Sequence, residues 1–572
     1  MTAFQPKVTA AIDFGTHGSG FGWAVVCEGN DDSATRKVLS VDGWQDQPHS
    51  YPKNLTALLM DGDGRVSAWG HAAVKKYNFH RGSNGHRLVN GLDMKMSLKP
   101  ESTNRDRNYA ADGVEELIVE YLRRLYADAV DHIATKGGFA EEEITWCLTV
   151  PAIWDDFARQ TMRRAAKRAG MPTDEQRFQL CLEPEAAALY ARNKLAGGGI
   201  DEPGTRLVIV DAGGGTVDIT AYEVEQDGRL AELIPPLGDG LGAEYVNTAF
   251  REKVLVPRLS SPDRADGCTN LLELESRVPG LLWHLLQDFE RTKVDFDPLQ
   301  ETPSRLALPT QLYLALDDTE RETLASKQDG IAYEFVLSRG EFISLFDHVI
   351  DPILKLVKKQ LDCVLAGATG PVRLLAVGGF AQSRYFQLRL NELQDDRVKL
   401  VIPPAPALAV LYGAVHFAYD PSALRVRRSR YTYGCDVSLP FEEGDPETSK
   451  NRDDGGKEFC SNRFKTFVLE SEPVEVGSAF THHFTPLRKA QKSVLFNLYR
   501  TPERKPRYID ERGSVSIGKL EIKLPSSLRS LSEGDRCIEL CMKFGGTEIT
   551  ATARILATGE TLETRVEFEP RW

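Results

Sequence analysis

Two short segments, far apart in the sequence, each place an aspartate just before a run rich in glycine. Asp13 precedes Gly15-Thr16-His17-Gly18-Ser19-Gly20, and Asp211 precedes Ala212-Gly213-Gly214-Gly215-Thr216. Glycine lets backbone amides approach phosphate oxygens closely. An aspartate at a strand end can hold Mg²⁺ through water, because that ion keeps most of its hydration shell. A single such turn is typical of a tight hairpin, but two with matching acids favour one phosphate and magnesium site.

Hydroxyl and carboxyl groups beside these turns extend the predicted site. Thr16 and Thr216 offer hydroxyls to phosphate oxygens, and Asp218 lies on the same strand face as Thr216, where it could orient water. His17 could contact a phosphate or cap the turn, and the sequence does not choose between these roles.

The segments around both turns predict strands rather than helices. Residues 8–14 and 207–211 are apolar and predict buried strands, and apolar residues resume at 21–26 and 217–224. A strand after the glycines argues against a Rossmann fingerprint and a Walker loop, because both need a helix there. Apolar periodicity predicts further helices over 113–134, 156–169, 383–393 and 405–419, and further strands over 144–150 and 374–377.

The pattern changes near residue 425. Arg425, Arg427, Arg428 and Arg430 form a short basic joint, and we place a domain boundary at 425–430. Beyond it, alternation predicts strands over 464–470, 480–484, 493–499, 520–524, 538–544, 548–556 and 564–568. Residues 444–457 are polar and acidic, and we expect a mobile loop there.

Composition narrows the class of protein. The chain has 572 residues and a formal net charge of -13, which disfavours generic nucleic-acid binding because that needs basic surface. It has no apolar run long enough to span a membrane and no secretory signal pattern. The nine cysteines include no CxxC pair, which favours reduced thiols. We expect a cytoplasmic protein that binds neither nucleic acid nor membrane.

Five segments together resemble the heat shock protein 70 family of the actin-like ATPase superfamily, and they stand in that family's order. Ile12-Asp13-Phe14-Gly15-Thr16 and Val210 to Asp218 resemble its two phosphate motifs, and Val377-Gly378-Gly379 resembles its adenosine motif. Leu182 to Ala188 and Gly240 to Glu244 resemble two further segments. Details such as Phe289 to Lys293, Gly379 to Ser383 and Lys95-Met96-Ser97-Leu98 are similar to the divergent heat shock 70 kDa protein 12 branch.

The resemblance implies roles for individual residues. Asp13 and Asp211 would organise Mg²⁺ through water, Glu183 would support that shell, and Lys95 would stand near the γ-phosphate, the alternative being an exposed loop lysine. Thr216 and Asp218 would position the attacking water. The implied nucleotide contacts are Gly15, Thr16, His17, Gly213, Gly214, Gly215, Thr216, Gly242, Glu244, Glu290, Lys293, Gly378, Gly379, Phe380 and Ser383. Phe380 stands where the family carries small polar residues and an arginine, so purine stacking would be aromatic.

The resemblance also implies a fold and a function. The expected fold is α/β, with a two-lobed actin-like (ribonuclease H-like) ATPase domain over 1–425 and a C-terminal β-sandwich-like domain over 430–572. Lobe I would cover about 1–205 and lobe II about 206–425, and the chain would partly return to lobe I over 375–425. No helical lid is expected after the sandwich. We expect neither a linker of the family's acidic type nor that lid, which weakens the expected coupling between the domains.

The expected function is a slowly hydrolysing, chaperone-like switch that uses ATP/ADP and Mg²⁺ in a stress response. It would engage a polypeptide client or protein partner, with a co-chaperone or nucleotide-exchange factor, as a monomer or weak dimer. One alternative is a nucleotide-bound scaffold with little hydrolysis, in which the C-terminal domain only stabilises or dimerises the protein. Another is a small-molecule kinase on the same fold, which the sequence favours least because it shows no convincing acid to deprotonate a hydroxyl.

Overall fold

The computed structural model describes residues 4–26, 36–79, 85–96, 111–195, 199–259, 281–368, 370–532, 534–546 and 548–565. Its chain divides into two compact units. Unit 1 comprises residues 1–153, 163–220 and 237–421, and unit 2 comprises 154–162, 221–236 and 422–572. The division therefore falls within α4 (Asp156–Arg168), β11 (Val217–Val224) and β12 (Leu230–Asp239).

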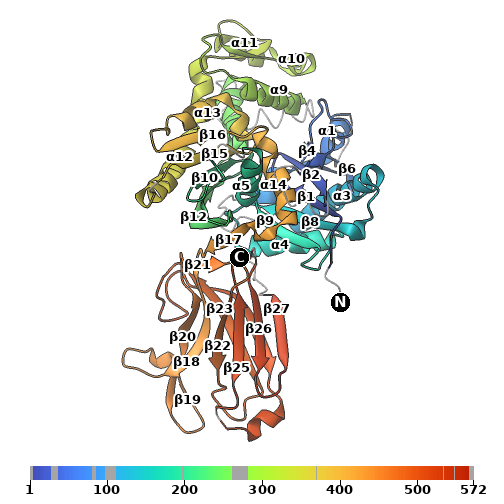
Figure 1. Cartoon of the computed structure of the whole chain (residues 1–572). Helices are drawn as coiled ribbons and strands as arrows, with labels where there is room; N and C mark the ends of the chain where they lie inside the picture. Colours follow the sequence, from blue (N-terminus) through green and yellow to red (C-terminus); the bar gives the residue numbers. More distant parts are fainter. Residues whose placement is uncertain are drawn as a thin grey trace. The chain divides into compact units, whose positions relative to one another are not determined.

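Unit 1 contains two sheets with the same strand arrangement (Figure 1). In the first, β1 pairs antiparallel with β2 and parallel with β8, and β8 runs parallel to β9. In the second, β10 lies between β11 and β15, and β10, β15 and β16 run parallel. The strands are β1 (Val8–Asp13), β2 (Gly18–Val25), β8 (Ile144–Val150), β9 (Phe178–Leu182), β10 (Arg206–Ala212), β15 (Val372–Val377) and β16 (Val398–Val401).

Each glycine-rich turn therefore connects the antiparallel pair of its sheet, as the sequence predicts. Strand β1 is buried along its whole length, and β10 is buried except at Arg206. Strands buried on both faces need covering helices, which is why they read as continuous apolar runs. This mixed α/β arrangement fits the expected actin-like ATPase fold.

Helices surround these sheets, and the predicted helices are confirmed with small changes at their ends. At the start of the last predicted helix, Pro406–Leu408 form a 3₁₀ turn before α14 begins. The helices are α1 (Gly70–Phe79), α2 (Gly91–Met96), α3 (Ala111–Gly137), α5 (Glu183–Lys194), α6 (Ala243–Phe250), α7 (Val256–Leu259), α9 (Leu281–Asp295), α10 (Thr310–Ala315), α11 (Asp318–Ser326), α12 (Arg339–Ala366), α13 (Arg384–Asn391) and α14 (Ala409–Tyr419). Smaller strands are β3 (Leu39–Ser40), β4 (Lys53–Leu55), β5 (Ala57–Met60), β6 (Val66–Trp69), β7 (Arg87–Asn90), β13 (Ser304–Ala307) and β14 (Glu334–Leu337).

Helices α5 and α14 cross closely because small residues meet at the crossing. A Cβ atom built on Gly413 of α14 would lie 1.7 Å from the carbonyl oxygen of Ala186 in α5. Ala187 and Ala188 of α5 and Ala414 of α14 are fully buried as well. The alanines that follow Glu183 thus fix the position of α5, and Glu183 is the first residue of that helix.

Unit 2 is built mainly from strands. One sheet has the order β19-β20-β18-β23-β24 and another the order β22-β25-β26-β27. Residues from both sheets, including Leu498, Leu520, Leu540 and Ala553, form one hydrophobic core. The strands are β18 (Thr432–Pro440), β19 (Lys450–Arg452), β20 (Glu458–Val468), β22 (Ala479–Phe484), β23 (Ser493–Thr501), β24 (Val515–Lys523), β25 (Ile538–Lys543), β26 (Thr550–Ile555) and β27 (Thr561–Arg565). Residues 566–568 of the last predicted strand lie outside the described residues.

The basic segment near 425 is itself a strand. Within unit 2, β17 (Leu424–Arg428) pairs parallel with β12 and antiparallel with β21 (Pro473–Glu475). Arg425 bonds Glu225 at 2.7 Å and Glu475 at 3.0 Å, so two carboxylates balance its charge.

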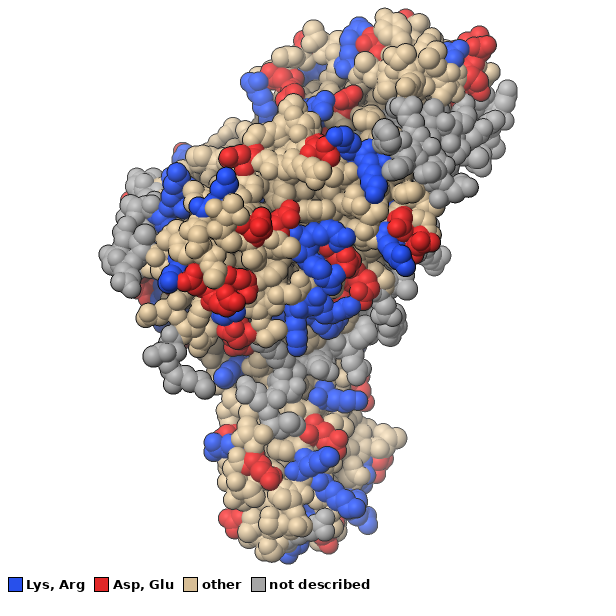
Figure 2. Space-filling view, turned by 90° about the vertical axis from the view of Figure 1, so that its right-hand side faces the viewer, with Lys and Arg blue, Asp and Glu red and all other residues tan. Residues whose placement is uncertain are grey.

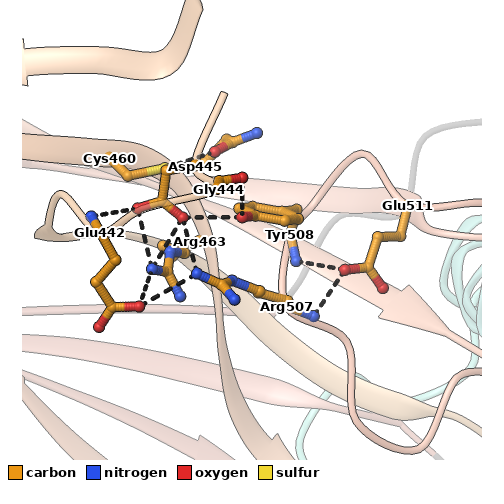
Figure 3. Close-up of polar contacts among 9 residues, drawn as sticks. Glu442, Gly444, Asp445, Cys460, Arg463, Arg507, Tyr508 and Glu511 are labelled. Atoms are coloured by element: carbon orange, nitrogen blue, oxygen red, sulfur yellow. Dashed lines mark hydrogen bonds and ion pairs between the residues drawn. The ribbon is translucent and has the colours of Figure 1, made fainter. Parts of the chain in front are cut away.

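The expected loop over residues 444–457 contains two short regular elements. That segment contains a 3₁₀ turn (Glu447–Ser449) and β19, which pairs with β20. Figure 3 shows how Asp445 fixes its start: the carboxylate accepts hydrogen bonds from Arg463 at 3.0 Å, Arg507 at 3.2 Å and Tyr508 at 2.8 Å. The segment is polar partly because Asp445 takes part in these ion pairs and partly because other residues of the segment are exposed to solvent.

On the face of the molecule shown in Figure 2, acidic and basic side chains lie interspersed, and acidic groups stand beside the largest group of basic ones. Among the residues that the structure describes, no helix combines the length and apolar character needed to cross a membrane.

Candidate functional site

A pocket in unit 1 brings both glycine turns together. Twelve of the residues predicted from the sequence line it: Asp13, Gly15, Thr16, His17, Lys95, Glu183, Asp211, Gly213, Gly214, Thr216, Gly378 and Gly379. They come from both sheets of unit 1, from α2 and α5, and from the segment after β15.

The two turns contact each other directly, which explains why the second needs consecutive glycines. A Cβ atom on Gly215 would lie 2.9 Å from the Oγ1 atom of Thr16, and one on Gly214 would lie 3.3 Å from Cβ of His17. Side chains at these positions would push the turns apart and widen the pocket between them.

Asp13 ends β1 at the floor of the pocket, and both its carboxylate oxygens have partners. Thr149 of β8 donates its hydroxyl to Oδ1 at 2.9 Å, and the ammonium of Lys53 lies 2.6 Å from Oδ2. Burial opposes the charge on Lys53, but the adjacent carboxylate of Asp13 outweighs burial and raises the pKa of the lysine. The first predicted metal-holding acid is thus paired with a cation from the chain itself.

Lys95 and Glu183 form a second buried pair. The Lys95 ammonium donates to Oε1 of Glu183 at 3.0 Å and to the carbonyl of Phe14 at 2.8 Å. Only 3% of the Lys95 side chain is exposed, so the alternative of an exposed loop lysine is wrong. Burial raises the pKa of Glu183, while the charge of Lys95 opposes that rise. Ser97 and Leu98 of the same motif lie outside the described residues.

Asp211 differs from Asp13, because its Oδ2 atom is buried and has no hydrogen-bond partner. Burial, followed by the charges of Glu183 and Asp218, raises the pKa of Asp211 well above its usual range. A cation beside this carboxyl would offset the cost of ionising it. Among the described residues, no three carboxylate, imidazole or thiol groups stand close enough to hold a metal directly.

Asp218 lies beneath the second turn rather than in the pocket lining. Its Oδ1 atom accepts a hydrogen bond from the backbone amide of Ile153 at 2.6 Å. The turn itself is closed by the amide of Gly213, which donates to the carbonyl of Thr216 at 2.9 Å. The bond from Ile153 fixes the carboxylate of Asp218, and the bond within the turn fixes the backbone of Thr216.

A chain of polar contacts leads from His17 to α9. The imidazole Nδ1 of His17 lies 2.7 Å from Oε1 of Glu244, and the amide of Asn247 donates to Glu244 at 2.8 Å and to Glu290 at 2.7 Å. The Lys293 ammonium then donates to Glu290 at 2.6 Å. Burial would lower the pKa of His17, but the hydrogen bond and charge of Glu244 outweigh it and raise that pKa. His17 therefore joins the first turn to α6 while also lining the pocket.

The predicted adenosine motif is only partly in the pocket. Gly378 and Gly379 line it, and Gly378 has φ of +89°, a conformation that favours glycine. Phe380 is 2% exposed and stacks on Phe386, with ring centroids 4.7 Å apart. This packing contradicts the expected stacking of a purine on Phe380, because the ring is already covered by the core. The hydroxyl of Ser383 caps α13 by accepting the amide of Phe386 at 3.4 Å.

Eight predicted residues do not line the pocket: Gly215, Asp218, Gly242, Glu244, Glu290, Lys293, Phe380 and Ser383. The structure also adds lining residues that the sequence did not predict, above all Tyr51 and Lys53, together with Gly18, Ala407 and Val410. Lys53 carries no motif of its own, because its place depends on the pairing of β4 with β2.

Nearly the whole chain is similar to two known proteins. No protein-family model matches it. The chain is similar to human heat shock 70 kDa protein 12A, at 26% identity over 98% of this chain and 91% of that protein. It is similar to human heat shock 70 kDa protein 12B, at 27% identity with the same coverage of both chains. It also resembles the chaperone protein dnaK of Thalassiosira pseudonana, at 24% identity over 57% of this chain and 46% of that protein.

Proposed function

Because the chain belongs to the heat shock protein 70 family, in its divergent heat shock 70 kDa protein 12 branch, we propose that it is an ATP-binding molecular switch. In this proposal unit 1 binds ATP or ADP and hydrolyses ATP slowly, and unit 2 engages a polypeptide client or partner. The observation that carries the proposal is the convergence of Asp13, Asp211 and the Lys95–Glu183 pair on one pocket between two glycine turns.

The chain's own groups suit a triphosphate at this place. Glycines of both turns line the pocket, where no side chain covers the backbone, and Thr16 and Thr216 belong to the same lining. The Lys95 ammonium is fixed by two hydrogen bonds, so it needs no reorganisation to stabilise charge that develops on a transferred phosphoryl group. Asp218, held by the amide of Ile153, would orient the attacking water.

A magnesium ion fits the acidic side of the pocket. The observation that supports this fit is the buried Oδ2 atom of Asp211, which has no hydrogen-bond partner among the described residues of the chain. Burial also raises the pKa of this carboxyl, and a nearby cation would offset that effect. Asp211 would hold the ion through water and Glu183 would support that shell, while Asp13, which Thr149 and Lys53 already bind, would stand beside it. When bound, Mg²⁺ supplies charge neutralisation for the phosphates.

Glu290 and Lys293 do not line the pocket as Gly378 and Gly379 do, so they would contact the adenosine only by leaving the bond that joins them. Asn247, which bonds both Glu244 and Glu290, links this group to the phosphate end of the pocket. Adenine selectivity would then depend on polar groups of α9 rather than on the ring of Phe380.

Unit 2 would serve as a β-sandwich-like partner-binding domain. Its two sheets share one core, and alternate residues of β25 are buried, which leaves the other face of that strand for solvent or a partner. An extended polypeptide could add to such a domain through main-chain hydrogen bonds and apolar pockets. In this proposal the protein binds a polypeptide client or partner and works with a co-chaperone or nucleotide-exchange factor. It is a monomer or weak dimer and acts in a cytoplasmic stress response.

Single-turnover hydrolysis tests the proposal. Wild-type protein, Lys95→Ala and Asp211→Asn are mixed with limiting ATP, and both bound nucleotide and released phosphate are measured. We expect tight ATP binding by the wild type and slow hydrolysis that falls about 100-fold or more in both variants. Lys75→Ala is the matched control, because the Lys75 side chain is 70% exposed.

Absence of ATP binding by the wild type, or hydrolysis in Lys95→Ala equal to that of the wild type, would contradict the proposal. A second candidate, a nucleotide-bound scaffold with little hydrolysis, is favoured by the occupied carboxylate of Asp13, which Thr149 and Lys53 already bind. Tight ATP binding by the wild type without phosphate release would support that scaffold.

A further inference from the structure

The side chain of Lys53 reaches the carboxylate of Asp13, one of the two acids that the family resemblance assigns to Mg²⁺. Lys53 comes from a strand that belongs to none of the nucleotide motifs. It begins β4, and its ammonium lies 2.6 Å from Oδ2 of Asp13. Only 14% of the lysine side chain and 5% of the aspartate side chain are exposed. A buried ion pair of this kind is fixed by its surroundings rather than formed by chance on a mobile surface.

The strand register shows how this contact is built. Asp13 of β1 is paired with Gly20 of β2, and Gly20 is paired with Lys53 of β4. Residues paired across neighbouring strands project to the same face. Asp13 and Lys53 therefore stand on one face, separated by a position without a side chain.

Glycine at position 20 allows the lysine to cross β2. A Cβ atom there would lie 3.2 Å from Cγ of Lys53 and 2.7 Å from the carbonyl oxygen of Pro52. The stem of Lys53 thus passes over Gly20, and β4 approaches β2 more closely than another residue would permit. One of the glycines of the first turn serves the ion pair as well as the hairpin.

The two acids of the pocket are consequently unequal. Asp13 has one partner for each oxygen, the hydroxyl of Thr149 and the ammonium of Lys53, whereas Oδ2 of Asp211 is buried without a partner. The uncompensated carboxyl is Asp211. A positive charge already stands at Asp13.

We propose that Lys53 supplies at Asp13 the positive charge that a divalent cation would otherwise supply, so that the pocket holds a nucleoside diphosphate or triphosphate without Mg²⁺. The inference rests on the proposed function, because it concerns the same pocket. The ammonium of Lys53 is part of the chain, so no cation has to be bound from solution to place a positive charge there. It can donate hydrogen bonds to a phosphate oxygen as well as to Asp13. Mg²⁺ at Asp211 would then add to hydrolysis more than to affinity.

The test compares nucleotide affinity with and without divalent cations. Binding of fluorescently labelled ADP to the full chain is measured by anisotropy, once with excess Mg²⁺ and once with EDTA. We expect the wild-type affinity to change less than about fivefold. In Lys53→Met the affinity in EDTA should fall about 10- to 100-fold, as expected for loss of a hydrogen bond to a charged group, and Mg²⁺ should restore most of it.

Lys53→Gln keeps a donor but removes the charge, and it should behave like Lys53→Met. Lys75→Met is the exposed control and should match the wild type. If wild-type protein binds ADP only with Mg²⁺, the inference is overturned while the proposed function stands, and this result needs no variant that folds. Equal Mg²⁺ dependence in Lys53→Met and wild type would also overturn it. Failure of the wild type to bind under either condition would overturn the proposed function itself.

Discussion

The imidazole of His17, in the first glycine turn, lies 2.7 Å from the carboxylate of Glu244, in the first turn of α6. The amide of Glu244 also donates to the carbonyl of Gly214 at 2.9 Å, so α6 contacts both glycine turns. Burial disfavours charge on His17, but Glu244 outweighs that effect and raises its pKa above the usual 6.5. We therefore expect the ion pair between His17 and Glu244 to weaken as pH rises through the raised pKa of His17.

Replacing His17 by glutamine should destabilise unit 1 slightly, and less as pH rises. A group whose pKa is raised by folding stabilises fully below its unfolded pKa, and this contribution disappears as pH rises through the folded pKa. Because the His17 side chain is 44% exposed, solvent screening limits the effect to about 0.2 to 1 kcal/mol. Melting temperatures of wild type and His17→Gln, measured from pH 6 upward, should differ by about 2 °C or less at the lowest pH and converge at high pH.

His348→Gln provides the control, since His348 is exposed on α12. It should leave the melting temperature unchanged across the series. Glu244→Gln should remove the same pH dependence, and the double variant should add little to either single one. A difference between wild type and His17→Gln that grows with pH would contradict the assigned ion pair.

Sequence patterns predicted the pocket well wherever the chemistry lies inside a contiguous motif. Asp13, Asp211 and the glycines around them are local signals, because a buried strand followed by glycines forms the same hairpin in many contexts. Lys53 could not be found this way. Its role arises from pairing of β4 with β2 across a glycine, and one sequence carries no sign of which strands become neighbours.

Two differences from the sequence-based expectations have a similar cause. Phe380 follows the adenosine glycines, but the aromatic core that contains Phe386 and Phe346 buries its ring. Asp445 lies in a polar stretch that resembles a loop, yet Arg463 and Arg507 come from distant positions to bind it. In both cases residues far away in the sequence decide the environment, so local composition misleads.

Gly413→Ala should destabilise unit 1 and disturb the pocket. The added Cβ atom would meet the carbonyl oxygen of Ala186 at 1.7 Å, and backbone of a neighbouring helix cannot move aside cheaply. Overpacking of this kind costs about 1 to 3 kcal/mol or more, despite the preference of about 1 kcal/mol for alanine over glycine inside a helix. Displacement of α5 would also move Glu183, its first residue, away from Lys95. Thermal unfolding measures the first effect.

Gly340→Ala is the matched control for that substitution. Gly340 lies in the first turn of α12, and an added Cβ atom there would have no heavy atom within 4 Å. It should be neutral or stabilise by up to about 1 kcal/mol. Equal melting temperatures for Gly413→Ala and Gly340→Ala would show that α5 and α14 can separate without cost.

Asp445→Asn should release the segment that leads into β19. Burial opposes charge on this carboxyl, but hydrogen bonds from the amide of Glu442 and from Arg463 outweigh it and hold the pKa of Asp445 well below its usual range. The folded protein therefore keeps this charge in the pH range where a free aspartate is protonated, and the stabilising contribution is lost progressively from that range down to the lowered pKa of the folded state. Asparagine keeps the shape but leaves the guanidinium of Arg463, whose side chain is only 10% exposed, with Glu442 alone.

Trypsin can report this release at neutral pH, because Lys450, Arg452 and Lys457 lie in or beside β19. Cleavage there requires local opening, so its rate follows the population of the open segment. We expect Asp445→Asn to be cut about tenfold faster than wild type, while Glu443→Gln, at an exposed neighbouring position, should be cut at the wild-type rate. Equal rates in all three proteins would mean that the pairing of β19 with β20, rather than the charge of Asp445, holds this segment in place.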